Sequence, residues 1–209
     1  MTAPERFFSG TSMPDRDWWH ALWPDPDATV RALSVARGMT VVDLGCGDGY
    51  FTAAIARQVA PGRVIGVDLD PRMLERAQST CAGMTNCEWQ TGDAMQVSQL
   101  VSQQVDYILI ANTFHGVPDK TALAREVAAT LKADGRFAIV NWQPIAREET
   151  RVLDKPRGPA TNLRLAPHQT RAAVEPAGFV QEGVVELPPY HYGIIFKRTR
   201  KSEPRPPTK

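Results

Sequence analysis

The chain lacks several features that would assign a class at once. It has three cysteines, Cys46, Cys81 and Cys87, with no CxxC pair, so no zinc site of the usual kind and no metal is expected. No apolar run approaches the ~20 residues of a membrane span. The first residues show no basic-then-apolar pattern of a signal peptide. A reducing, cytoplasmic location is therefore the expectation.

The chain also lacks an excess of charge of either sign. The chain has 24 Lys and Arg against 23 Asp and Glu, a net charge of +1. No global field would recruit nucleic acid or an anionic membrane, so neither is predicted as a partner. The 209 residues, with 43% hydrophobic and 22% charged content, are typical of a globular domain with a substantial core. The oligomeric state is not fixed by these observations.

What is present is an alternation of strand and helix patterns from about residue 28 to 142, which predicts parallel strands covered by helices. Strands are expected at 40–44, 63–67, 87–90, 105–110 and 135–140, followed by an antiparallel pair at 179–187 and 190–198. Helices are expected at 28–36, 50–59, 71–79, 120–131 and 167–177. Residues 144–166 lack periodicity and predict a loop over the site.

A glycine-rich turn follows the first strand, in the run VVDLGCGDGYFT from Val41 to Thr52. Gly45, Gly47 and Gly49 let the main chain approach a ligand where a Cβ would clash. Asp43 precedes them and would repel a phosphate, but suits a ligand with hydroxyls and positive charge. Hydroxyls, an amine and a sulfonium describe S-adenosylmethionine. The glycines alone also fit a nicotinamide or flavin site, or a tight turn with no ligand.

Polar residues stand at the ends of the next strands. Asp68 ends the second strand, where an acid can accept hydrogen bonds from ribose hydroxyls. Asp93 lies in the turn Gly92-Asp93-Ala94 after the third strand, and Asn112 follows the fourth. Because ligands of open α/β sheets bind beyond the carboxyl ends of the strands, this spacing predicts one shared site.

With these motifs in order, the stretch from about Thr40 to Trp142 resembles the class I S-adenosylmethionine-dependent methyltransferases, in particular small type 11/25-like enzymes acting on metabolites. The resemblance implies a Rossmann-like, doubly wound, seven-stranded and mostly parallel sheet with an antiparallel last strand and helices on both faces. It also implies S-adenosylmethionine as cofactor and S-adenosylhomocysteine as product. The cofactor-binding residues would be Gly45, Gly47 and Gly49 under the methionine part, Asp43 at its amino group, Asp68 at the ribose, Leu69 against the adenine, Asp93 and Ala94 at the adenine amine, and Asn112.

The acceptor side is less defined. Methyl transfer from a sulfonium depends mainly on positioning, and a general base is needed only when the acceptor must lose a proton. His115 is the candidate base, with a structural hydrogen bond as the alternative role. Trp142 after the fifth strand, and Trp19 in the aromatic segment Trp18 to Trp23, are candidate walls of the acceptor pocket.

The domain boundaries follow from this interpretation. Residues 1–36 are predicted as a lid or cap, 37–200 as the cofactor-binding domain and 201–209 as a disordered tail. The predicted function is methyl transfer to a small-molecule acceptor, with N, O, S or C as the nucleophile. Two alternatives remain: a binding module without catalysis, and a nucleotide-dependent oxidoreductase. Lipid and quinone acceptors also stay open.

Overall fold

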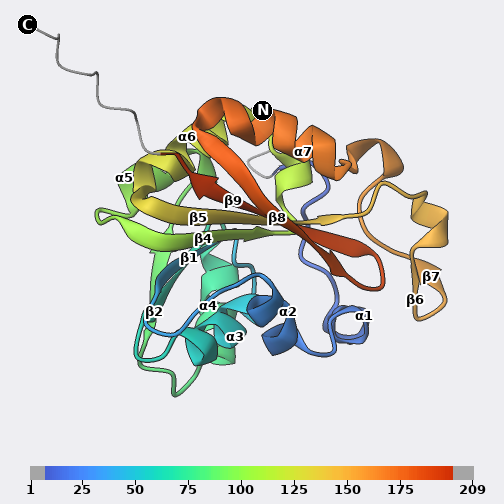
Figure 1. Ribbon diagram of the computed structural model, residues 1–209. Coiled ribbons are helices and arrows are strands. Elements are labelled where there is room, and N and C mark those ends of the chain that lie inside the picture. Colours follow the sequence, from blue (N-terminus) through green and yellow to red (C-terminus); the bar gives the residue numbers. More distant parts are fainter. Residues whose placement is uncertain (1–7, 200–209) are drawn as a thin grey trace, which may run out of the picture.

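The structure is a computed structural model that describes residues 8–199. Seven strands form one sheet in the order β3-β2-β1-β4-β5-β9-β8 (Figure 1). Strands β1 to β5 run parallel, and β9 is antiparallel to both β5 and β8. The predicted fold is therefore confirmed. The strands are β1 (Thr40–Leu44), β2 (Arg63–Asp68), β3 (Cys87–Thr91), β4 (Val105–Ala111), β5 (Leu131–Trp142), β8 (Phe179–Leu187) and β9 (His191–Arg198).

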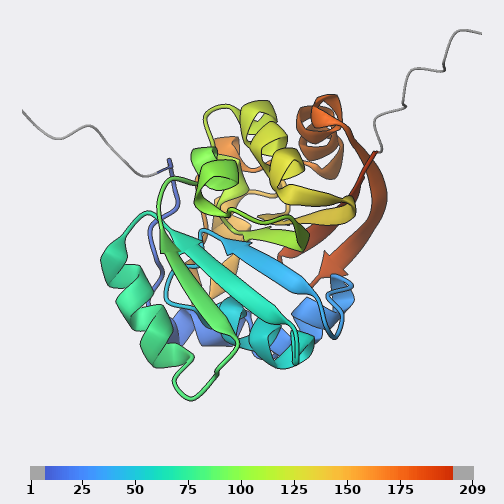
Figure 2. The same cartoon turned by 90° about the vertical axis from the view of Figure 1, so that its left-hand side faces the viewer.

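Helices cover both faces of this sheet. Figure 1 shows α1 to α4 below it and α5 to α7 above it, and Figure 2 shows α4 beside the edge formed by β2 and β3. Each sheet face buries its own apolar cluster, since neighbouring residues of a strand such as Val41 and Val42 point to opposite faces. The helices are α1 (Arg16–Leu22), α2 (Pro26–Ala32), α3 (Tyr50–Val59), α4 (Pro71–Thr80), α5 (Val97–Leu100), α6 (Lys120–Thr130) and α7 (Pro167–Val174).

Two predicted boundaries are corrected. The helix expected at 28–36 is α2, which starts earlier because Asp25 accepts a hydrogen bond from the Ala28 amide at 2.8 Å. It ends at Ala32, and Ser34 has a φ of +63°, so Gly38 does not end it. The helix expected at 120–131 ends at Thr130, because Leu131 is fully buried and pairs with Val105 as the first residue of β5.

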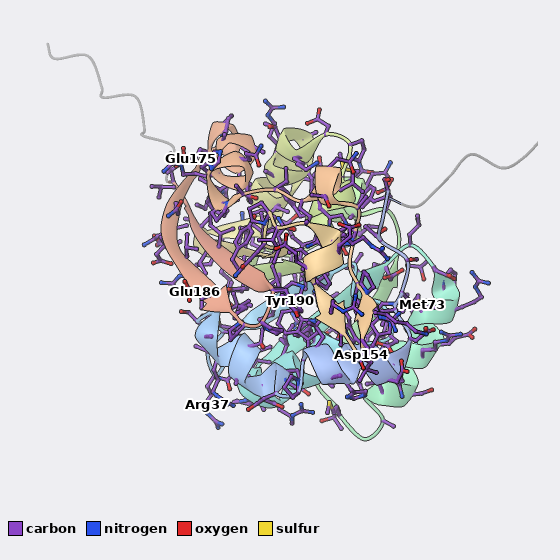
Figure 3. All side chains as sticks on the ribbon, turned by 90° about the vertical axis from the view of Figure 1, so that its right-hand side faces the viewer. Arg37, Met73, Asp154, Glu175, Glu186 and Tyr190 are labelled. Atoms are coloured by element: carbon purple, nitrogen blue, oxygen red, sulfur yellow. The ribbon has the colours of Figure 1, made fainter. Side chains whose placement is uncertain are left out.

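The segment expected to be a loop, residues 144–166, contains a small hairpin of β6 (Arg151–Val152) and β7 (Lys155–Pro156). The hairpin contacts α1, and Figure 3 shows its tip at Asp154 beside that helix and near Tyr190. The Tyr190 hydroxyl donates to the Arg151 carbonyl at 3.0 Å. Residues 144–166 therefore form an ordered wall beside the carboxyl edge of the sheet.

The N-terminal segment packs against the same wall. Three tryptophans of this segment, Trp18, Trp19 and Trp23, are buried and belong to the core cluster under the sheet. The boundary at residue 36 and the lid role of 1–36 stay predictions, and the predicted tail at 201–209 lies outside the described residues. Among residues 8–199, no helix has the length and the apolar composition to cross a membrane.

Candidate functional site

A cavity of about 800 Å³ lies at the carboxyl edge of the parallel strands. It is centred where the strand order reverses between β1 and β4, the usual ligand position in open α/β sheets. Its volume is within the ~300–1,000 Å³ range of small-molecule sites. The strand ends form one side, and residues 8–14, α1 and the 142–159 segment form the other.

The glycine turn forms the floor of the cavity. The amides of Gly45 and Cys46 donate to the Val67 carbonyl at 2.8 and 3.0 Å, which fixes the turn on the end of β2. Gly45 and Gly47 line the cavity with φ values of +75° and +55°. A Cβ on Gly47 would lie 2.9 Å from Met13 Sδ, so residues 8–14 pass directly over this turn. A side chain at position 47 would therefore fill the narrow space between this turn and residues 8–14.

Gly49 has a different role from the predicted one. It is buried, does not line the cavity, and precedes α3 with a φ of +83°. A Cβ there would lie 2.9 Å from the Cα of Ala77 in α4. The expectation that Gly49 packs under the cofactor is corrected: this glycine allows α3 and α4 to approach each other.

Asp43 is 2% exposed at the end of β1 and accepts a hydrogen bond from the Thr52 hydroxyl at 2.6 Å. Burial, with a smaller contribution from the neighbouring Asp68 carboxylate, raises the pKa of Asp43 to about 7 despite the bond from Thr52. No cationic side chain among residues 8–199 forms an ion pair with this buried carboxylate. A cationic group in the cavity would stabilise its ionised form.

Asp68 joins three segments at the end of β2. Its Oδ2 accepts from the Gly47 amide at 2.9 Å, and its Oδ1 accepts from the Asp70 amide at 2.9 Å. Burial raises its pKa above the ordinary value. Each oxygen keeps a further lone pair, so the carboxylate can still accept from ligand hydroxyls. Asp70 itself caps α4 by accepting from the Arg72 amide at 3.0 Å, as its place before Pro71 predicts.

The residues predicted around the adenine also line the cavity. Leu69 follows β2, and Ala94 begins the turn after β3. Asp93 Oδ1 accepts from the Met95 amide at 2.9 Å, which caps that turn. No partner among residues 8–199 occupies Asp93 Oδ2. The turn-capping role and the ligand role therefore use different oxygens.

Asn112 stands at the centre of the cavity edge, after β4. Its φ is +56°, a conformation that asparagine tolerates better than most residues. Both its Nδ2 and Oδ1 are buried without a hydrogen-bond partner among the described residues. A buried amide left unpaired is costly, so this side chain is suited to a polar ligand group.

His115 is 5% exposed and lies on the same edge, in a short turn after β4. Its Nε2 is 3.1 Å from the Gly10 carbonyl oxygen. Since a carbonyl only accepts, Nε2 carries the proton, and in the neutral ring Nδ1 has a free lone pair. Nδ1 has no partner among the described residues. Burial, together with Lys120 and Arg164, lowers the His115 pKa and favours the neutral ring, against the bond to Gly10.

Aromatic side chains enclose the remaining end of the cavity. Trp19 and Trp142 both line it and are only 7% and 3% exposed, so each is also part of the core. Trp18 lines it as well, and two arginines, Arg147 and Arg157, come from the 142–159 segment. Sequence reasoning missed the arginines and Met13. The charge-rich composition of 144–166 was the available signal.

Together these features define a class. The sheet with its antiparallel β9, the glycine turn after β1 preceded by the buried Asp43, and the acids Asp68 and Asp93 after β2 and β3 match a class I S-adenosylmethionine-dependent methyltransferase. The residues present fit this cofactor, because Asp43 is a buried acid without a described cationic partner and Asn112 is an unpaired buried amide at the same cavity. A family model described as a methyltransferase domain matches residues 36–169, so the chain belongs to that family.

Curated relatives match over part of the chain. A demethylmenaquinone methyltransferase of Lactobacillus johnsonii is 34% identical over 114 residues, covering 53% of this chain and 46% of that protein. One from Staphylococcus aureus is 31% identical over 117 residues, covering 56% and 47%. The chain thus spans about half the length of the curated relatives it matches.

Solved structures share the fold. A SAM-dependent methyltransferase from Aquifex aeolicus has a TM-score of 0.73 at 22% identity, covering 88% of this chain and 93% of that chain. An S-adenosylmethionine-dependent methyltransferase from Mesorhizobium loti has a TM-score of 0.64 at 23% identity, covering 85% and 98%.

The two different glycine environments can be tested as a pair. Gly47→Val is expected to abolish S-adenosylhomocysteine binding while the far-ultraviolet circular dichroism stays close to wild type, because its side chain enters the cavity. Gly49→Val is expected to lower the melting temperature strongly, because its side chain meets the backbone of α4. Calorimetry and thermal unfolding separate the two effects. Normal affinity of a folded Gly47→Val protein would contradict the role given to this turn.

Asp43 predicts a pH dependence of cofactor binding. Above pH 7 the ionised carboxylate attracts the amino group of S-adenosylhomocysteine, and protonation through its pKa of about 7 removes that attraction. Affinity should therefore fall as the pH decreases from 8 to 6. Asp43→Asn should show weaker binding at pH 8 and little change with pH.

The same substitution should stabilise the free protein at pH 8. An acid with a raised folded-state pKa lowers stability as the pH rises from its unfolded value toward its folded value. Asp43→Asn removes this cost and keeps an oxygen that can accept from Thr52. A wild-type affinity that is flat between pH 6 and 8, or a less stable Asn variant, would argue against a buried ionisable Asp43.

Proposed function

We propose that the protein transfers a methyl group from S-adenosylmethionine to a small-molecule acceptor. One observation carries the proposal: Asp68 at the end of β2 holds the glycine turn through the Gly47 amide, at the edge of a cavity large enough for a small molecule. When bound, the cofactor supplies an electrophilic methyl group on its sulfonium. Membership in the methyltransferase-domain family supports this function over an oxidoreductase or a module without catalysis.

In this proposal the residues of the chain bind and position. Gly45 and Gly47 would lie under the methionine part, and Asp43 would face its amino group. Asp68 would accept from the ribose hydroxyls, with Leu69 against the adenine. Asp93 and Ala94 would meet the adenine amine, and Asn112 would pair with a polar group at the centre of the cavity. Trp19 and Trp142 would be walls that exclude water from the acceptor.

His115 would act as the base for an acceptor that must lose a proton. Its protonated Nε2 is held by the Gly10 carbonyl, and its Nδ1 lone pair is unpaired among the described residues. The lowered pKa keeps the ring neutral at pH 7, which is the form that can take up a proton. Acceptors with a free lone pair would need positioning alone.

The curated relatives are named for an acceptor of the quinone type, and an aromatic cavity suits such a molecule too. Because the chain spans about half of those proteins, the acceptor is proposed only at the level of a small molecule. A cytoplasmic location and the absence of a nucleic-acid partner are part of the same proposal; the near-balanced charge of the chain supports the latter.

Cofactor choice is the first test. Calorimetry should detect S-adenosylhomocysteine binding and no NADH binding. Asp68→Ala should weaken S-adenosylhomocysteine binding by ~1.5–3 kcal/mol, the range for hydrogen bonds to a charged group. Asp106→Ala is the control, since Asp106 also accepts a backbone amide, from Thr40 at 2.8 Å, but lies at the opposite ends of the strands. Tight NADH binding, or wild-type affinity in folded Asp68→Ala, would refute the assignment.

The base is tested once a screen of amines, thiols, phenols and quinols has found an acceptor that releases S-adenosylhomocysteine. His115→Ala should lower kcat by ~10²–10⁴-fold with cofactor affinity little changed. In the wild type, kcat should rise with pH around the His115 pKa, which lies below the ordinary histidine value of 6.5. The variant should lose this rise. His115→Gln keeps an N–H for the Gly10 carbonyl, so full activity in this variant would reduce His115 to a structural role.

A further inference from the structure

Charge is divided across the cavity along the sheet. The lining acids Asp43 and Asp68 lie near the carboxyl ends of β1 and β2, and Asp93 follows β3, whereas Arg147 and Arg157 follow β5. Arg72 also lines the acidic side, but it is paired with Asp70. In the order β3-β2-β1-β4-β5, the strands that carry the acids lie on one side of the point where the strand order reverses, and the strand that leads to the arginines lies on the other. A ligand that spans the cavity would therefore meet acids at one end and guanidinium groups at the other.

Both arginines lack an acidic partner among the described residues. Arg157 is half-buried, and its side chain donates no hydrogen bond within residues 8–199; its Nε is buried and unpaired. The side chain of Arg147 donates only from Nε, to the Gly158 carbonyl at 3.0 Å, among the described residues. Five other arginines are paired with carboxylates: Arg16 with Asp48, Arg57 with Asp27, Arg63 with Glu88, Arg72 with Asp70 and Arg136 with Glu182.

The backbone that carries Arg157 is fixed in place. Its amide donates to the Thr150 carbonyl at 2.9 Å, and its carbonyl accepts from Thr150 Oγ1 at 2.8 Å. The carbonyl also accepts from Arg164 at 3.0 Å. Arg164 is only 5% exposed and lies 5.0 Å from the Trp142 ring centroid. A cation held on a rigid backbone loses little freedom when it binds a ligand.

The surroundings of Arg157 are flat and aromatic. Its guanidinium lies 4.8 Å from the Trp18 ring centroid, and its terminal N–H groups donate to none of the described residues. Trp19 packs edge-on against Trp18 with ring centroids 5.6 Å apart. Gly158 lies so close to Trp142 that a Cβ would be 2.7 Å from that ring. This end of the cavity thus combines apolar walls with a forked donor.

We propose that the acceptor is a planar aromatic molecule carrying a carboxylate, which Arg157 binds with support from Arg147. This inference rests on the proposed methyl transfer and specifies its substrate class. Guanidinium matches a carboxylate in two parallel hydrogen bonds, and the indole walls accommodate a ring. The acids at the other end repel an anion, so the acceptor binds in one orientation, with its carboxylate away from the cofactor.

The cofactor carries a carboxylate as well, so the test must separate the two sources. Protein saturated with S-adenosylhomocysteine is titrated by calorimetry with hydroxybenzoates and hydroxynaphthoates, and with the matching uncharged carboxamides. Wild type should bind the carboxylates about tenfold or more tightly than the amides. Arg157→Gln should reduce that preference to about twofold or less, and Arg157→Lys should keep part of it because it retains the charge.

Arg151→Gln is the matched control. Arg151 begins the hairpin that directly precedes Arg157, donates to the Asp154 carbonyl and does not line the cavity, so the preference should stay at the wild-type value. S-adenosylhomocysteine affinity, measured separately, should be unchanged in all three variants. If Arg157→Gln weakens the binding of S-adenosylhomocysteine as much as the binding of the carboxylates, Arg157 binds the cofactor and the proposal is wrong.

The proposal is also overturned if wild type prefers the amides or binds neither series, or if Arg157→Gln keeps the preference. Failure of the methyltransferase function has a different signature: wild-type protein that does not bind S-adenosylhomocysteine in the first titration. Release of S-adenosylhomocysteine from S-adenosylmethionine with a carboxylate probe, lost in Arg157→Gln through a higher KM, would be the strongest support.

Discussion

The carboxylate of Asp68 is the interaction on which the cofactor half of the site depends. It accepts from the amides of Gly47 and Asp70, and so joins the glycine turn after β1 to the start of α4. Without these bonds, two amides beside the cavity would need other partners. The ligand position is thus set before any ligand arrives, because the group proposed to accept from the ribose also fixes the loop under the methionine part.

The same acids make the site electrostatically costly. Asp43 and Asp68 both have pKa values raised mainly by burial, and the Asp68 carboxylate raises the pKa of Asp43 further. Buried carboxylates without cations destabilise a fold, and a cationic ligand offsets that cost. These acids thus lower the stability of the free protein while they favour ligand binding, a common arrangement at functional sites. At the other end, Arg147 and Arg157 carry the opposite charge, and neither forms an ion pair within residues 8–199.

Local patterns allowed the cofactor half to be predicted. Alternating elements, the glycine turn and the strand-end acids each follow from neighbouring residues, and the predicted sheet is confirmed. Gly49 shows the limit of such patterns: in the sequence it is equivalent to Gly47, and only the packing of Ala77 in α4 separates their roles. The start of β5 at Leu131 likewise depends on pairing with Val105 across the sheet.

The acceptor half could be predicted only in part. Trp19, His115 and Trp142 were candidates from their places in the sequence and line the cavity, but distant contacts build the rest of this half. Residues 144–166 have no periodicity because their order comes from Arg164, whose side chain binds the carbonyls of Ile145, Arg157 and Pro159 and the Thr150 hydroxyl. These contacts join one side chain to carbonyls and a hydroxyl up to 19 residues away in the sequence, so no local periodicity encodes them. In such a fold the methyl donor can be inferred from local sequence patterns, whereas inferring the acceptor requires the three-dimensional arrangement of this wall.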